Sequence, residues 1–205
     1  MTLTSIRTSR LAHAASGLLA ATLVCCAPTA FAQNQSRSNE PVGHGYVGLT
    51  GGPSDFSRIS GGNGLYSRED RNTAYSVAFG NYYLSPDVGL ELGYTNFGQV
   101  SRGGGTTKAE GINLSLIGKL PLNQSFNLLG KIGTTYGHTD VSAQPLSGVT
   151  QGSESGFDWS YGIGTELLIN PQWSAVLLYD ETLMKFAGGS SDRVSTVRLG
   201  ARMRF

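Results

Sequence analysis

The chain has 205 residues, a formal net charge of +1 and a charged fraction of 14%, against about 25% in typical soluble domains. Its length suits one domain, and near-neutral charge without a basic run argues against a nucleic-acid-binding protein. The sequence contains 29 glycines, 9 tyrosines and 8 phenylalanines. Many glycines and aromatics with few charges favour a crowded all-β protein over a helical one.

The first 32 residues have the pattern of a signal peptide. Arg7 and Arg10 form a positive start, Leu11–Cys26 is mostly apolar, and the motif Ala-Phe-Ala ends at Ala32. The apolar run falls short of the ~20 residues that span a bilayer, which disfavours a retained anchor. The pattern predicts cleavage between Ala32 and Gln33.

Both cysteines, Cys25 and Cys26, lie inside this segment. The mature chain would then contain no disulfide, thiolate nucleophile or cysteine metal site. A lipid-modified cysteine is the alternative, but it needs a small preceding residue, and Val24 stands before Cys25.

Residues 33–43 are polar and aperiodic, which predicts a flexible leader, and residues 44–205 then form the folded domain. Eight segments alternate between large apolar side chains and small or polar ones, as two-faced strands do. For example, Leu90, Leu92 and Tyr94 alternate with Gly89, Glu91 and Gly93. The expected strands are Tyr46–Gly52, Thr73–Leu84, Val88–Gly98, Gly111–Leu120, Phe126–His138, Phe157–Ile169, Trp173–Met184 and Arg193–Phe205.

The connections alternate between short and long. Short turns are expected at Ser85–Asp87, Leu122–Ser125 and Asn170–Gln172, and long loops at Pro53–Arg71, Gln99–Glu110, Thr139–Gly156 and Lys185–Asp192. This alternation is typical of an outer-membrane barrel with tight periplasmic turns and longer external loops. The sequence therefore predicts an all-β fold, an eight-stranded antiparallel transmembrane β-barrel.

A soluble barrel of the lipocalin type is the main structural alternative. Such a protein would hold its large apolar residues inside and its charges outside. Here one face of each strand consists of glycine, serine and charged residues, and a barrel of eight strands has little interior room. Small residues inside and large apolar residues outside favour lipid as the surroundings.

Five charged residues are expected to point into the lumen near the short turns: Glu91, Lys119, Lys131, Glu166 and Arg198. Neighbouring strands suggest that Glu91 pairs with Lys119 and Lys131 with Glu166. Charges in so narrow an interior need partners, so this lumen charge cluster predicts a plugged barrel. Aromatic residues on the apolar face near the strand ends predict interfacial girdles: Tyr75, Tyr94, Tyr136, Trp159, Trp173 and Tyr179.

The chain resembles the outer membrane protein A-like transmembrane domain family. The resemblance rests on Ala78–Tyr82, Gly89–Tyr94 and Gly164–Pro171, and extends as a pattern of segments from Gly45 to Phe205. The terminal Phe205, with Leu199, Ala201 and Met203 at alternate positions before it, resembles the signal read by the barrel-assembly machinery. No cofactor is implied.

Two features of the family's lumen are matched and two are not. Glu91 and Glu166 match its two acidic positions, whereas Val176 and Ile117 stand at its lumen arginine and lysine, so its ion-pair gate does not carry over. Larger relatives add a peptidoglycan-binding domain after the barrel. We expect none here, and no tethering to the cell wall.

Two motifs point elsewhere. The glycine motif beginning at Gly43 fits G-x-G-x-x-G, but a dinucleotide site needs a strand before it and a helix after it. His138, Asp140 and Ser142 suggest a nucleophile site, yet lipid A deacylase barrels show His-x-Ser, and Asp140 stands where that serine would be. A polar strand end is favoured, and no enzyme is expected. Three histidines without cysteines make no metal pattern.

The expected role is that of an integral protein of the outer membrane that maintains the envelope and mediates adhesion through its loops. A narrow or gated channel for ions or small solutes is the first alternative, and a lipid-modifying barrel enzyme is a weaker one. The expected partners are outer-membrane lipid, lipopolysaccharide and the barrel-assembly machinery, with no nucleic acid. We expect a monomer.

Overall fold

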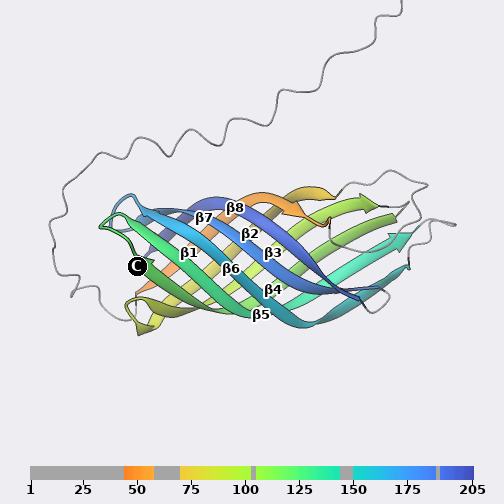
Figure 1. Ribbon diagram of the computed structural model, residues 1–205, viewed down its shortest axis with the longest axis horizontal. Helices are drawn as coiled ribbons and strands as arrows, with labels where there is room; N and C mark the ends of the chain where they lie inside the picture. The colour runs from red at the N-terminus through yellow and green to blue at the C-terminus, as the bar shows by residue number, and fades with distance from the viewer. Residues whose placement is uncertain (1–43, 58–69, 103–104, 144–149, 188–189) are drawn as a thin grey trace, which may run out of the picture. The chain divides into compact units, whose positions relative to one another are not determined.

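The computed structural model describes residues 44–57, 70–102, 105–143, 150–187 and 190–205. The expected signal peptide, cleavage site and leader lie outside the described residues. Within them, eight antiparallel strands form a closed barrel in chain order (Figure 1), which confirms the expected fold. The strands are β1 (Gly45–Asp55), β2 (Arg71–Ser85), β3 (Val88–Arg102), β4 (Gly105–Pro121), β5 (Phe126–Ala143), β6 (Gly152–Leu168), β7 (Trp173–Phe186) and β8 (Ser190–Arg204).

The two faces of the strands are those expected from the alternation. Leu92 on β3, Leu114 on β4 and Leu199 on β8 are half or more exposed on the outer surface, whereas Glu91 and Ser115 are buried inside. In water such a belt of exposed apolar side chains would be unstable, but it matches the hydrocarbon of a bilayer. No helix of the described residues is long and apolar enough to cross a membrane.

Three short turns close one end of the barrel, which we call the turn end. Asparagine side chains hold two of them: Asn123 accepts a hydrogen bond from the Ser125 amide at 2.9 Å, and Asn170 accepts one from the Trp173 amide at 2.8 Å. Such local bonds stabilise tight turns. At this end, Phe205 exchanges backbone hydrogen bonds of 2.9 Å with Gly45. We call the opposite end the loop end.

At the loop end the strands are longer than the sequence pattern predicted. The expected loops Gln99–Glu110 and Thr139–Gly156 are wrong. β3 continues to Arg102 and β4 begins at Gly105, while β5 continues to Ala143 and β6 begins at Gly152. β5 has 18 residues, while about 9–11 suffice to cross a bilayer. The outward side chains become polar beyond the apolar belt, so the apolar alternation ends while the backbone ladder continues.

A bulge in β3 marks this change. The register with β4 shifts between Asn96 and Gly98, and Gly98 has a φ of 87°, which side chains with a Cβ rarely adopt. Asn96 accepts a hydrogen bond from the Gly98 amide at 2.9 Å. The extra residue reverses the alternation, so that both Phe97 and Val100 point inward.

The inward side chains of β7 change in character along the strand. Val176 and Leu178 belong to an apolar cluster near the turn end. Asp180 is buried next along the strand. Met184 and Phe186 then belong to a larger apolar cluster at the loop end. On β7 a buried charge therefore lies between two apolar clusters, and we call the buried charges of the interior the charged layer.

Candidate functional site

Glu91 is the centre of the charged layer. Its side chain is 2% exposed and accepts hydrogen bonds from the Tyr46 hydroxyl at 2.5 Å, from Arg202 Nη2 at 3.0 Å and from Lys131 Nζ at 3.3 Å. These partners come from β1, β8 and β5, so the contacts cross the lumen. Two cations and a hydroxyl thereby replace the water that a carboxylate loses on burial.

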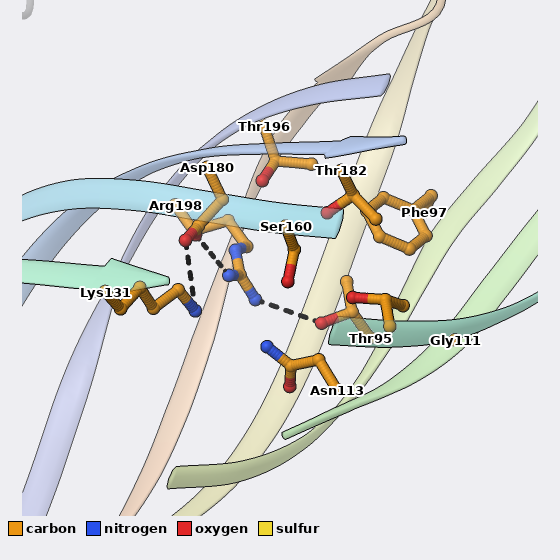
Figure 2. A pocket seen from close by; sticks show the side chains of 11 residues that line it. Thr95, Phe97, Gly111, Asn113, Lys131, Ser160, Asp180, Thr182, Thr196 and Arg198 are labelled. Carbon is orange, nitrogen blue, oxygen red and sulfur yellow. Dashed lines mark hydrogen bonds and ion pairs between the residues drawn. The ribbon is translucent and has the colours of Figure 1, made fainter. Parts of the chain in front are cut away.

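Asp180 forms the second half of the layer (Figure 2). Lys131 Nζ lies 3.0 Å from Asp180 Oδ1, and Arg198 donates to the other carboxylate oxygen and to Thr95 Oγ1 at 3.3 Å. Lys131 therefore lies between both acids. Glu91, Lys131, Asp180, Arg198 and Arg202 form one connected network, which we call the lumen network.

The structure places all five residues of the expected lumen charge cluster inside the barrel, but the expected pairs are wrong. Lys119 lies 3.8 Å from Asp87 in a turn, rather than beside Glu91. Glu166 instead accepts hydrogen bonds from Asn127 at 2.9 Å and from Ser174 at 2.7 Å. The expectation assumed that neighbouring strands supply the partners, whereas long side chains in a narrow lumen also reach strands farther around the barrel.

Three members of the site were missed. Asp180 and Arg202 lie at inward positions of their strands, so the alternation alone could have found them. Tyr46 was obscured because aromatic residues were expected on the lipid face. It fits inside because Gly80 opposes it on β2: a Cβ on Gly80 would lie 2.3 Å from the Tyr46 ring.

Little free volume remains around the network. Two interior cavities, one lined by Thr95 and Asp180 and the other by Glu91 and Arg202, each measure about 10 Å³, which is room for about one water molecule. Ile117 and Val176, at the positions where the resemblance implied a lysine and an arginine, are buried apolar side chains. Lys131, Arg198 and Arg202 supply the positive charge instead.

The loop end of the lumen is closed by apolar side chains, which we call the apolar plug. Its members come from five of the eight strands and from the residue after β1: Phe56, Phe97, Val100, Ala109, Val141, Met184, Phe186 and Val194. An ion crossing this layer would lose its hydration without gaining polar partners. The buried apolar side chains of this layer therefore pack together across the loop end of the lumen.

The residues of the expected assembly signal lie on the last strand. Leu199 and Met203 are exposed on the outer face, together with Ala201. Phe205 contacts Phe79 of β2, with ring centroids 6.1 Å apart. Among the described residues, no group of three or more histidine, cysteine, aspartate or glutamate residues is arranged to hold a metal ion.

Comparisons with known proteins agree with this architecture. The model of the family described as "Outer membrane protein beta-barrel domain" matches residues 17–205. Outer membrane protein A of Shigella flexneri is 27% identical over 110 residues, which is 51% of this chain and 32% of that protein. The chain thus spans about a third of the length of this curated relative.

Solved structures show the same fold at low identity. Neisserial surface protein A superposes with a TM-score of 0.63 and 13% identity over 78% of this chain and 97% of that chain. Ail, the attachment invasion locus protein of Yersinia pestis, gives a TM-score of 0.52 and 18% identity over 80% and 100% of the two chains. The N-terminal barrel domain of Pseudomonas aeruginosa OprF gives a TM-score of 0.52 and 14% identity over 80% and 98%.

Proposed function

Because the chain belongs to the outer membrane protein β-barrel domain family and is an integral protein of the outer membrane, we propose that it is a closed barrel that anchors an interaction surface outside the cell. The lumen filled by the lumen network and the apolar plug is the observation that carries this proposal. A barrel that is closed through its whole length acts through its outer surface rather than through a pore.

The extension of β3–β6 beyond the membrane supplies that surface. In barrels of this class the longer connections lie outside the cell, so the loop end is external. The outward side chains there are polar and exposed, among them Gln99, Lys108 and Asp140. Side chains on strands are held more rigidly than those on free loops. The extension is therefore suited to binding lipopolysaccharide or another surface.

Attachment is the role that we assign to this extension. Ail, whose fold is similar, is named for attachment and invasion and was solved with the heparin analogue sucrose octasulfate. The proposal includes a monomer that is inserted by the barrel-assembly machinery. A narrow channel is less well supported, because the apolar plug gives ions no polar partners on their way through.

A complementation experiment tests the proposal. Cells that lack the protein receive either the wild type or a variant in which Ser101–Thr106 is replaced by Asn-Gly, a short hairpin turn that keeps Val100 and Thr107 in register. A control variant carries the same two residues inserted after Asn123 at the turn end. Attachment to epithelial cells and resistance to detergent are measured at equal barrel levels.

We expect the wild type and the turn-end control to restore attachment, and the shortened variant to restore only detergent resistance. Equal attachment by all three strains, or by cells without the protein, would overturn the surface role.

A further inference from the structure

Three side chains on the outer surface at the loop end form a connected chain. Ser155 on β6 places its Oγ 2.7 Å from Nδ1 of His138 on β5, and Nε2 of His138 lies 3.2 Å from Oδ2 of Asp140. Ser155 and His138 are directly paired across the ladder, and Asp140 lies two residues farther along the same face. No serine stands two residues after His138 in the sequence. The serine beside His138 comes from the neighbouring strand instead.

The hydrogen bonds of this chain suit a nucleophile and its base. With the imidazole proton on Nε2, His138 donates to the Asp140 carboxylate, and its unprotonated Nδ1 accepts the hydroxyl proton of Ser155. A serine, a histidine that removes its proton and an acid that orients the histidine are the parts needed for acyl transfer. The geometry is recognised by these roles and not by the order of the residues in the sequence.

The site lies at the edge of the apolar belt. Tyr136 and Phe157 are the next outward residues toward the turn end, with ring centroids 4.9 Å apart, and Phe157 and Trp159 are about two-thirds exposed. Exposed aromatic side chains of this kind lie at the membrane interface, where acyl chains join their head groups through ester bonds. Ser155 and His138 are the next outward pair beyond these rings, toward the loop end.

A donor for the oxyanion is the backbone amide of Ser155 itself. The amide of Leu168 on β6 donates a hydrogen bond toward β5, and the amide of Ile169 donates one toward β7. Because amide directions alternate along a strand without a bulge, the odd-numbered residues of β6 direct their amides toward β7. The described β6–β7 ladder ends at Ser160 and Thr182, which leaves the Ser155 amide beyond its last pair.

We propose that Ser155 and His138 are the catalytic residues of a serine esterase site and that Asp140 positions His138. The site hydrolyses ester-linked acyl chains of outer-leaflet lipid. The Ser155 amide stabilises the oxyanion, as preorganised donors do in acyl transfer. This inference goes beyond the surface role, which does not depend on it, and it reverses the expectation that the chain has no catalytic site.

The reaction balances with water as the only co-reactant. Ser155 Oγ attacks the ester carbonyl carbon as its proton moves to His138 Nδ1. The bond from carbon to the alkoxy oxygen breaks, and His138 returns the proton to the leaving alcohol, which is the deacylated lipid. Water then attacks the acyl-serine, giving its proton to His138. The bond from carbon to Oγ breaks, Oγ regains the proton, and the fatty acid is released.

Labelling and turnover test the proposal on the full-length protein extracted from membranes and kept folded in detergent. A fluorophosphonate probe reports a reactive serine, and mass spectrometry locates it. Fatty acid release is measured separately from phosphatidylcholine micelles and from lipopolysaccharide, which distinguishes the two sources of acyl ester. Heat-modifiable mobility on gels confirms that each variant is folded.

We expect the wild type to be labelled at Ser155 and to release fatty acid from at least one of the two lipids. Ser155→Ala and His138→Ala should each lower that rate by at least about 100-fold. Asp140→Ala should lower it less, with partial rescue by Asp140→Glu. The matched control Ser153→Ala, the next outward serine on β6, should keep the wild-type rate. An inert and unlabelled wild type, undiminished activity in Ser155→Ala, or loss of activity in Ser153→Ala would overturn the proposal.

Discussion

Replacing Glu91 by alanine should destabilise the barrel more than any other single change in the lumen network. The variant removes the acceptor of three hydrogen bonds, from Tyr46, Lys131 and Arg202. Lys131 keeps Asp180, but Arg202 loses its carboxylate partner while it is 2% exposed. Breaking one partner of a buried ion pair costs about 3–5 kcal/mol, and we expect a loss of that size in the free energy of unfolding.

Urea titration of the folded protein in lipid vesicles, followed by tryptophan fluorescence, measures this loss. Glu91→Gln keeps the size and one acceptor oxygen, and should have a smaller effect. Glu154→Ala removes an exposed acid of β6 and should change stability by less than about 0.5 kcal/mol. If Glu91→Ala unfolds within about 1 kcal/mol of the wild type, the network contributes little to holding the barrel together.

Further predictions concern the two faces and the two ends of the chain. Leu92→Arg places a cation on the lipid face and should destabilise by about 2–4 kcal/mol; a vesicle-folding gel shift equal to that of the wild type would mean that the faces are reversed. Gly80→Val should destabilise by about 1–3 kcal/mol, because a Cβ there would lie 2.3 Å from the Tyr46 ring, and unchanged urea unfolding would contradict that packing. Deleting Phe205, which bonds to Gly45 and contacts Phe79, should slow insertion and leave protease-sensitive periplasmic material; normal heat-modifiable levels would speak against its role. The intact mass of the extracted protein should correspond to a chain beginning at Gln33, and retention of Met1 or an acylated cysteine would refute that prediction.

The alternation of side chains predicted the faces of all eight strands. The reason is physical: lipid selects large apolar residues such as Leu92 and Leu199 outside, and a narrow lumen selects small or paired polar residues such as Ser115 and Glu91 inside. The loop end was less predictable. Beyond the membrane, Lys108 and Asp140 face water, so their polarity no longer distinguishes strand from loop while the backbone ladder continues.

The partners inside the lumen could not be predicted from neighbouring strands. Lys131 on β5 contacts Glu91 on β3 and Asp180 on β7, so each contact skips one strand. The interaction between Ser155 and His138 depends on a register that the sequence does not specify, since 16 residues separate the two in the chain. In both cases the chemistry of the residues was visible, but their proximity depended on the closure and stagger of the barrel.

Single-channel recording tests the closed barrel most directly. Purified wild-type protein, inserted into planar lipid bilayers at several hundred millimolar salt, should give no stable conductance steps, because the apolar plug and the lumen network fill the interior. A lipid-facing aromatic variant such as Trp159→Phe serves as a matched insertion control and should behave in the same way. Regular, long-lived conductance steps from the folded wild type would contradict a closed interior.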